Sequence, residues 1–132
     1  MKHLSMAVVV RNGKVLVQER QKAAKGVVVE FPGGEVLENE TGTDASVRKL
    51  YEETHLEGLN HVATSAGIND FGGRIYYAVF RASEQVKPKV VDSERRQAFK
   101  WLKPDELPLD EFHTADVDFI NTKLGKYCVS DA

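Results

Sequence analysis

The hydrophobic pattern of residues 5–20, SMAVVVRNGKVLVQER, predicts two β-strands that form a hairpin. Both halves of this stretch are rich in valine, and Asn12-Gly13 between them is the dipeptide that most strongly favours a tight hairpin turn. In the second strand Val15 and Val17 alternate with Leu16 and Gln18, so at least one face of this strand is expected to be buried.

Residues 27–37 predict a short strand, a break at Pro-Gly-Gly and a second extended piece, and a helix is expected to follow. Thr41 or Thr43 can cap the N-terminus of this helix, and Gly58 is a suitable residue for its end. Four residues recur at helical spacing and are expected to form the buried stripe of the helix: Val47, Leu50, Tyr51 and Thr54.

The second half of the chain predicts three more strands and a C-terminal helix. Residues 59–70 and 73–84 are expected to pair through a glycine turn, and residues 96–102 form another short strand. The helix is expected within residues 114–126. Strands interleaved with two helices predict an α/β domain with a mixed β-sheet between helices.

Composition narrows the compartments and partners that are expected. A length of 132 residues is usual for one domain, so residues 1–132 are expected to form a single unit. The net charge of −2 provides no basic surface for nucleic acid or for an anionic membrane. No apolar run approaches the roughly 18 residues of a membrane span, and the first segment is too short and too soon polar for a signal peptide. Cys128 is the only cysteine, so no intrachain disulfide forms, and a cytoplasmic protein is expected.

The stretch RKLYEETHLEG, residues 48–58, places two adjacent glutamates near the end of the predicted helix. Such a pair usually belongs to a solvated helix face. Here Glu52 and Glu53 oppose the helix dipole by roughly 0.3–1 kcal/mol each. Their i,i+4 partners, Arg48 and Lys49, precede them, which is the less favourable order for an ion pair on a helix. The arrangement stabilises a helix poorly, and this favours a functional reason for it.

The loop before the helix is suited to binding a hard cation. Two glycines in FPGGE, residues 31–35, let backbone carbonyls approach a ligand closely, and Glu35, Glu38 and Glu40 add carboxylates. Mg²⁺ is usually bound by one or two carboxylates together with water and substrate phosphates. A loop carbonyl and the helical acid pair therefore predict a Mg²⁺ site.

These residues resemble the Nudix box, G-x5-E-x7-R-E-U-x-E-E-x-G-U, in which U is a bulky aliphatic residue. The matching positions are Gly34, Glu40, Arg48, Leu50, Glu52, Glu53 and Leu56. The preceding EFPGG and the later SERRQAFKWLKPDELP are also similar to the MutT-like branch, so the resemblance covers essentially the whole chain. It implies an α/β/α sandwich. It also implies hydrolysis, dependent on Mg²⁺ or alternatively Mn²⁺, of a nucleoside diphosphate linked to another group.

Two positions depart from the box. His55 replaces its glycine, and this change is expected to move the helix end toward Gly58. Lys49 replaces a glutamate that, in the family, holds metal together with the residue at the position of Glu53. An ammonium there is expected to attract Glu53 by roughly 3 kcal/mol at about 5 Å, before solvent losses. It would then compete with a weakly held cation.

The resemblance also implies roles for single residues. The expected metal ligands are the carbonyl of Gly33 or Gly34 and the carboxylates of Glu52, Glu53 and Glu94. Arg48 would orient the acid pair, with Glu40 and Lys49 as supporting residues around it. Glu94 comes from a loop, where it could act as the general base or be an ordinary surface acid.

Asp116, Phe71 and Tyr77 are the candidate substrate-binding residues. The branch that hydrolyses 8-oxo-dGTP reads the purine with a polar residue near the position of Asp116, and a carboxylate can accept hydrogen bonds from guanine-type N–H groups. Asp116 could equally be a first-turn helix acid. Phe71 and Tyr77 could stack on a base, although aromatic residues at period two in a strand usually belong to the core.

Two functions follow from these residues. The first is a nucleotide diphosphatase, in which a metal-activated water attacks a phosphoanhydride phosphorus. The second, favoured by Lys49, is a nucleotide-binding sensor or regulator with little or no catalysis. Both take a small-molecule nucleotide as partner, and proteins of this kind are commonly homodimers. The chain lacks the downstream proline of ADP-ribose hydrolases and any dinucleoside-polyphosphate signature, which favours nucleoside triphosphates.

Overall fold

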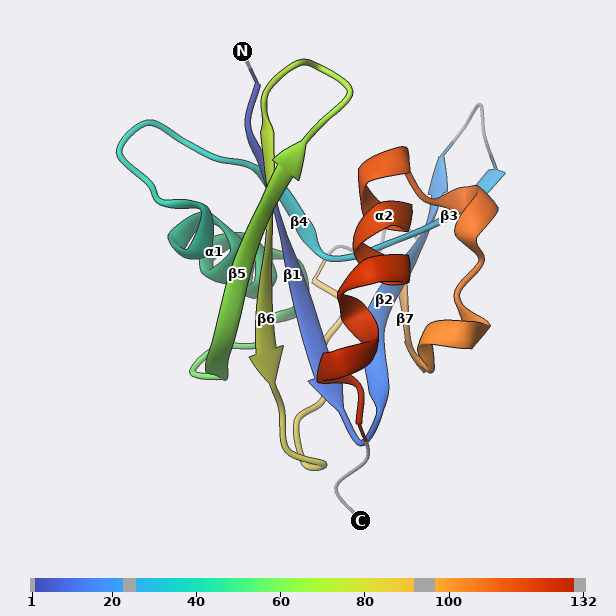
Figure 1. The fold of residues 1–132 in the computed structure, drawn as a ribbon. Coiled ribbons are helices and arrows are strands. Elements are labelled where there is room, and N and C mark those ends of the chain that lie inside the picture. Colours follow the sequence, from blue (N-terminus) through green and yellow to red (C-terminus); the bar gives the residue numbers. More distant parts are fainter. Residues whose placement is uncertain (1, 23–25, 92–96, 130–132) are drawn as a thin grey trace.

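The computed structural model describes residues 2–22, 26–91 and 97–129, which are built around one mixed β-sheet (Figure 1). The strands run in the order β3-β2-β1-β6-β5, with β4 paired to β1 and β7 paired to β2. β1 is parallel to β6 and antiparallel to β2 and β4. The strands are β1 Leu4–Arg11, β2 Lys14–Lys22, β3 Gly26–Glu30, β4 Gly33–Glu35, β5 Asn60–Ile68, β6 Arg74–Arg81 and β7 Ala98–Leu102.

The hairpin between β1 and β2 confirms the prediction from the sequence. Val10 pairs with Val15 on the neighbouring strand. Asn12 and Gly13 between them have φ angles of 49° and 77°, which is the left-handed conformation that a two-residue hairpin turn of this kind requires. The hairpin places β1 in the middle of the sheet, next to β4, from which the glycine loop continues.

Both faces of the sheet are buried, and each face is covered by a helix (Figure 1). The two α-helices are α1, Gly42–Thr54, and α2, Thr114–Thr122. Ala7 and Val8, which are successive residues of β1, belong to different cores: Ala7 lies in the core with Leu50 of α1, and Val8 lies in the core with Phe119 of α2. This arrangement confirms the predicted α/β/α sandwich with a mixed sheet between helices.

Helix α1 begins as predicted but ends differently. Thr41 is the N-cap residue, and its side chain accepts a hydrogen bond of 3.0 Å from the N–H of Asp44. At the other end His55, rather than Gly58, is the first residue beyond the helix. His55 has a φ of 62°, and its N–H donates to the carbonyl of Tyr51 at 2.9 Å. The histidine therefore adopts the left-handed conformation that suits the glycine of the box, at a cost of about 1–2 kcal/mol.

The buried face of α1 is rotated relative to the predicted stripe. Leu50 and Thr54 are buried as expected, but Val47 and Tyr51 are 43% and 45% exposed. The residues of α1 that are buried are Ala45, Ser46, Leu50, Glu53 and Thr54. Small side chains lie against the sheet, and the rotation that brings them there also turns Glu53 inward.

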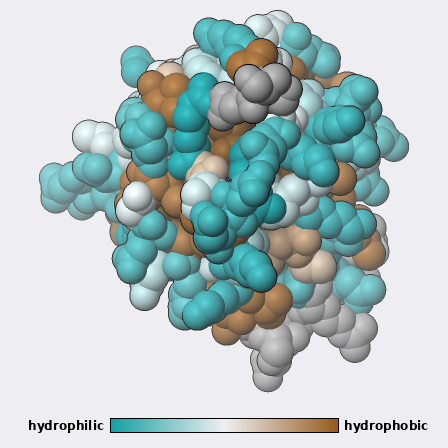
Figure 2. Space-filling model, turned by 90° about the horizontal axis from the view of Figure 1, so that it is seen from below, coloured by the Kyte–Doolittle hydropathy of each residue, from teal (hydrophilic) through white to brown (hydrophobic). Residues whose placement is uncertain are grey.

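Helix α2 lies within the predicted range of residues 114–126, buries Phe119 and Ile120, and is followed by a short 3₁₀ turn that buries Leu124. The 3₁₀ turns of the described chain are η2 Pro104–Glu106, η3 Leu109–Glu111 and η4 Leu124–Tyr127. Within the described ranges, no helix has the length and apolar character needed to cross a bilayer. Figure 2 shows the molecule from below, a face on which hydrophilic residues predominate and apolar residues are scattered among them.

Candidate active site

Arg48 connects helix α1 to the loop that precedes it. Its Nε donates to Glu40 Oε2 at 2.8 Å, and its Nη2 donates to Glu40 Oε1 at 3.1 Å and to the carbonyl of Glu35 at 3.0 Å. Its Nη1 donates to Glu52 Oε2 at 2.9 Å. The hydrogen bonds from Arg48 hold the pKa of the Glu40 carboxyl below its ordinary value. All three guanidinium nitrogens are thus engaged within the protein, which suits the predicted orienting role.

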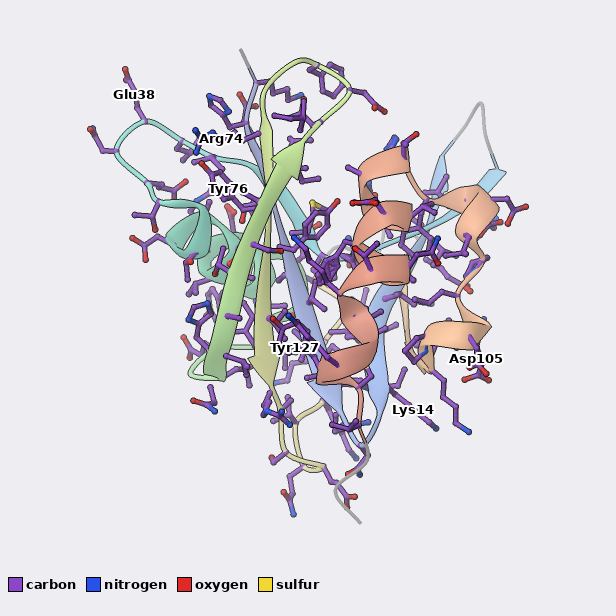
Figure 3. All side chains as sticks on the ribbon, viewed as in Figure 1. Lys14, Glu38, Arg74, Tyr76, Asp105 and Tyr127 are labelled. Atoms are coloured by element: carbon purple, nitrogen blue, oxygen red, sulfur yellow. The ribbon has the colours of Figure 1, made fainter. Side chains whose placement is uncertain are left out.

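The three acids between the glycines and α1, of which Glu35 ends β4 and Glu38 and Glu40 lie in the loop, occupy different environments. Glu40 is turned toward the helix, where Arg48 binds it, and it also accepts a hydrogen bond of 2.9 Å from the N–H of Leu37. Glu38 is exposed on the outer part of the loop and is directed away from the sheet (Figure 3). Glu35 is exposed and contributes its backbone carbonyl rather than its carboxylate to Arg48. The loop therefore brings the Glu40 carboxylate against the box helix.

Glu53 is only 5% exposed and is held from two sides. Gly33 N–H donates to its Oε2 at 2.8 Å, and Gln18 Nε2 donates to its Oε1 at 3.0 Å. Behind this pair, Gln97 Nε2 donates to Gln18 Oε1 at 2.6 Å. The carboxylate is thereby fixed between the helix, the glycine loop and strand β2.

Gln18 and Gln97 were not among the predicted site residues, although the sequence carries a signal for one of them. Gln18 continues the buried run Val15–Val17 on β2, where both neighbouring faces are apolar, and it is 1% exposed. A polar side chain at such a position needs a hydrogen-bond partner. The partner is Glu53, which is far away in sequence. The pattern alone therefore marks Gln18 as a buried polar residue but does not identify its partner.

Lys49 lies along the glycine loop and is 27% exposed at its side chain. Its Nζ is 3.9 Å from Glu52 Oε2, so the ion pair in the structure is with Glu52 and not the expected one with Glu53. The difference arises because Glu53 is turned toward the sheet. A β-carbon built on Gly34 would lie 2.6 Å from Lys49 Cε and 3.4 Å from its Nζ, so the lysine stem occupies the space that a side chain at Gly34 would need.

A cavity of about 330 Å³ adjoins the glycine loop. Gly33 and Gly34 line it from β4, Phe71 lines it from the loop between β5 and β6, and Asp116 lines it from α2. The fold thus brings predicted metal-binding and substrate-binding residues to one space, although they are far apart in the sequence. Its volume lies in the range of about 300–1,000 Å³ that is typical of small-molecule sites.

Asn69 fixes the loop that carries Phe71. It is 7% exposed, its Oδ1 accepts from the N–H of Phe71 at 2.8 Å, and its Nδ2 donates to the carbonyls of Lys2 and Arg74 at 2.8 and 2.9 Å. Phe71 itself is 64% exposed, with Lys2 Nζ 5.4 Å from its ring centre. An exposed aromatic ring on an anchored loop at the edge of a cavity is suited to stacking on a planar group.

Asp116 and Tyr77 form a buried pair beside the cavity. Tyr77 donates its hydroxyl to Asp116 Oδ1 at 2.5 Å, and Asp116 is 4% exposed. Burial raises the pKa of Asp116 above its ordinary value, and the hydrogen bond from Tyr77 offsets part of that rise. Tyr77 stacks on Phe119 with ring centres 4.5 Å apart, so it belongs to the core and holds Asp116 in place. A direct contact of Tyr77 with a base stays a prediction.

The sequence model of the NUDIX domain matches residues 1–122. The chain belongs to the Nudix family. It is a MutT-like Nudix hydrolase, and enzymes of this family act on nucleoside diphosphate-linked substrates with the help of divalent metal ions. The predicted family is therefore confirmed, and the box is the segment that runs from Gly34 to Leu56.

Solved structures agree with this membership. The E. coli ORF135 protein is 26% identical, with a TM-score of 0.64 over 92% of this chain and 86% of its own. A MutT NUDIX hydrolase from Burkholderia pseudomallei is also 26% identical, with a TM-score of 0.62 over 90% of this chain and 94% of its own. A bifunctional NMN adenylyltransferase/ADP ribose pyrophosphatase from Francisella tularensis is 20% identical with a TM-score of 0.72 over 96% of this chain and 41% of its own, and shows the shared fold alone. The comparison with curated proteins gave no match.

The donors at the Nudix box suit a metal ion with few protein ligands. In the part of the chain that the structure describes, no three His, Cys, Asp or Glu side chains are grouped so that they could hold a metal together. Glu52 and Glu53 could offer two carboxylates and Gly34 a carbonyl, and Lys49 stands where the box has a third carboxylate. This set fits a divalent cation that takes its remaining ligands from water and substrate phosphates, which is the usual mode for Mg²⁺.

Glu94 lies outside the described residues, so its expected place at the metal stays a prediction. The segment that contains it leads into Gln97, which is 7% exposed and bonds to Gln18 behind Glu53. Gln97, the first described residue after this segment, therefore lies close to Glu53.

Proposed function

We propose that this protein is a single-domain nucleotide diphosphatase that uses Mg²⁺, or alternatively Mn²⁺, to hydrolyse a nucleoside diphosphate linked to another group, with nucleoside triphosphates preferred. The observation that carries the proposal is the position of Glu53. This buried carboxylate accepts a hydrogen bond of 2.8 Å from the N–H of Gly33, and Gly33 lines a cavity together with Phe71 and Asp116. A helix that only had to pack on the sheet would place an apolar side chain there.

The residues of the box divide the work at the phosphates. Glu52 and Glu53 would hold the cation together with the carbonyl of Gly34. When bound, the cation supplies Lewis-acid chemistry: it neutralises charge on the phosphoryl oxygens and makes water a better nucleophile. Arg48 fixes the direction of Glu52 through two hydrogen bonds, of 2.9 and 3.2 Å, and ties the helix to Glu40. Glu94 is proposed as a further ligand or as the base that takes the proton of the attacking water.

The opposite side of the cavity would bind the nucleoside. Asp116 presents a carboxyl group that accepts a hydrogen bond from Tyr77. When this carboxyl is ionised it can accept a hydrogen bond from a base N–H, and when it is protonated it can donate one. Phe71 would stack on the base, since base–aromatic stacking contributes roughly 1–3 kcal/mol. The cavity is thus organised for a nucleotide with its base near α2 and its phosphates near the box.

A second candidate function is a nucleotide sensor or regulator with little catalysis. The observation that favours it is the ion pair of Lys49 with Glu52. The ammonium neutralises part of the negative charge of Glu52 that would otherwise attract a cation. Nucleotide would still bind in the cavity, and its hydrolysis would be slow. The two candidates differ in turnover, not in ligand.

The proposed compartment is the cytoplasm. Cys128 is the only cysteine of the chain and is half-buried. Burial raises the pKa of its thiol to about 11, so the thiol stays protonated at neutral pH and is a poor nucleophile. Such a cysteine is suited to a reducing environment as a packing residue.

Incubation with a panel of nucleotides, in Mg²⁺ and separately in Mn²⁺, tests the proposal through the release of phosphate and pyrophosphate. A diphosphatase releases product from at least one nucleotide only when metal is present, and Glu53→Gln abolishes most of that release. Nucleotide binding by calorimetry without release in either metal would instead support the sensor.

A further inference from the structure

Lys49 carries a cation at the place where the glycine loop meets the box helix. Its stem covers Gly34, and its Nζ would be 3.4 Å from a β-carbon at that glycine. Gly34 also lines the cavity of about 330 Å³. The lysine side chain therefore lies beside a residue that lines the cavity, and it is partly open to solvent at 27% exposure.

Two described arginines near the glycine loop are already engaged by acids, and Lys2, which also lines the cavity, has its Nζ 5.4 Å from the centre of the Phe71 ring. Arg48 donates from all three nitrogens to Glu35, Glu40 and Glu52. Arg20, which lines the cavity, is bonded to Glu30. Lys49 Nζ pairs with Glu52 Oε2 at 3.9 Å, which is longer than a hydrogen bond, and the Glu52 side chain is 47% exposed. An ion pair this open contributes little, so the ammonium can exchange Glu52 for another anion at small cost.

We propose that Lys49 is a phosphate-binding residue, and that it lets the site hold the phosphate chain of a nucleotide without any metal ion. The inference rests on the proposed function for the class of ligand, a nucleoside polyphosphate. A lysine ammonium is a compact charge with three donors, which suits it to phosphate oxygens. At this position it supplies positive charge that a glutamate could supply only by holding a cation. The substitution in the box then changes how the site is charged rather than abolishing its ligand.

Equilibrium binding in EDTA tests this proposal. The probes are the α,β-methylene analogue of GTP, which resists hydrolysis at that bridge, and inorganic tripolyphosphate, which carries similar charge without a base. The wild type is compared with Lys49→Met, which keeps the length of the stem, and with Lys49→Arg, which keeps the charge. Lys126→Met is the matched control, because Lys126 is an exposed lysine on the turn after α2.

We expect the wild type to bind the probes in EDTA and Lys49→Met to bind them at least tenfold more weakly, a difference of about 1.4 kcal/mol. Lys49→Arg should stay close to the wild type, and Lys126→Met should not differ from it. Higher salt should weaken binding of the wild type more than that of Lys49→Met, because the lost contact is a charge. Thermal unfolding checks that each variant is folded. If Lys49→Met does not fold, Lys49→Gln takes its place.

Three results would overturn the proposal: no binding by the wild type in EDTA, equal or tighter binding by Lys49→Met, or an equal loss in Lys126→Met. Its failure is distinguishable from failure of the proposed hydrolase. A protein that binds probes in EDTA through Lys49 but hydrolyses nothing in Mg²⁺ keeps this inference and loses the enzyme. A protein that hydrolyses nucleotides in Mg²⁺ but binds nothing in EDTA keeps the enzyme and loses this inference.

Discussion

Glu52 and Glu53 are neighbours in the sequence but lie in different environments. Glu52 is half-exposed and paired with Arg48 and Lys49, whereas Glu53 is buried and accepts from Gln18 and Gly33. The helix sets this difference, because adjacent side chains point about 100° apart around its axis. The acid pair thus offers one carboxylate that hydrogen bonds hold rigidly and one that is open to solvent.

At the same residue scale, the buried Asp116 makes stability depend on pH. Burial raises its pKa in the folded protein above the unfolded value, so the folded state binds the proton more tightly. This contribution is present at low pH and is lost as pH rises from the unfolded pKa through the raised folded pKa. Asp116→Asn keeps an oxygen for the Tyr77 hydroxyl and cannot ionise.

We therefore expect Asp116→Asn to be more stable than the wild type at neutral pH, and the advantage to shrink as pH falls toward the ordinary pKa of an aspartate. Chemical denaturation from pH 4 to pH 8 measures this difference. The exposed Asp118 on the same helix gives a control, Asp118→Asn, for a general effect of removing negative charge. A difference that is equal for both variants, or independent of pH, would contradict the assignment.

The sequence could identify some of the site at this scale and not the rest. The box spacing selects Gly34, Glu52 and Glu53 as the proposed metal site, because a site made by a loop and one helix is local in sequence. Gln18 lies on β2 and reaches Glu53 only through the fold of the sheet. The same limit applies to Lys49, since which acid it pairs with depends on how far α1 is rotated against the sheet.

At the scale of the element, helix α1 shows where pattern and packing diverge. Its N-cap at Thr41 follows from local hydrogen bonding and was predictable. Its buried face was not, because Val47 and Tyr51 are apolar by type yet exposed, while small residues at Ala45 and Ser46 allow close contact with the sheet. Hydrophobic spacing alone does not show whether a helix packs on the sheet through small side chains, which allow close contact, or through large apolar ones.

The C-terminal end of α1 provides the second prediction. His55 has a φ of 62°, in which a β-carbon is disfavoured by about 1–2 kcal/mol, and its ring stacks on Tyr51 with centres 5.1 Å apart. His55→Gly relieves the strain but loses this stacking and adds about 0.4–1 kcal/mol of chain entropy in the unfolded state. We expect the variant to be as stable as the wild type or more stable, by up to about 1 kcal/mol.

Urea unfolding of His55→Gly and of Glu57→Gly checks this expectation. Glu57 is exposed in the following loop and is not among the residues with positive φ, so glycine there should only destabilise. If both variants lose similar stability, the left-handed histidine carries no strain and the account of the helix end is wrong.

At the scale of the whole molecule, the sandwich brings β4, the loop between β5 and β6, and α2 around one cavity. β1 separates two cores, β4 extends from it into the glycine loop, and the cavity lies between that loop and α2. Valine-rich runs and the Asn-Gly turn made the strands predictable, and helical spacing with a capping threonine made the helices predictable. The meeting of Phe71 and Asp116 with the box was not predictable from pattern, since it depends on the parallel pairing of β1 with β6.

Metal binding should change the unfolding temperature of the whole molecule. Lys49→Glu restores the third helical carboxylate and brings like charges within one helical turn, which costs a few tenths of a kcal/mol, about 0.2–0.5, without metal. We expect its unfolding temperature in EDTA to be slightly below that of the wild type. Mg²⁺ should raise it by more than it raises the wild type, because binding to the folded state stabilises by linkage.

Thermal unfolding across a Mg²⁺ series measures this effect, and Lys49→Gln serves as the control that removes the ammonium without adding a ligand. A Mg²⁺-dependent rise that is no larger in Lys49→Glu than in Lys49→Gln would show that position 49 does not face the metal.

The rate of nucleotide hydrolysis as a function of Mg²⁺ concentration, in the wild type and in Glu53→Gln, tests the central claim most directly. We predict that turnover by the wild type rises with Mg²⁺ and saturates, and that Glu53→Gln is slower by about 10²-fold or more at saturating metal, a loss of at least ~2.7 kcal/mol of transition-state stabilisation. Glu57→Gln, an exposed acid beyond the helix, should match the wild type. Equal turnover by Glu53→Gln, or the absence of Mg²⁺-dependent hydrolysis of every nucleotide by the wild type, would contradict the account.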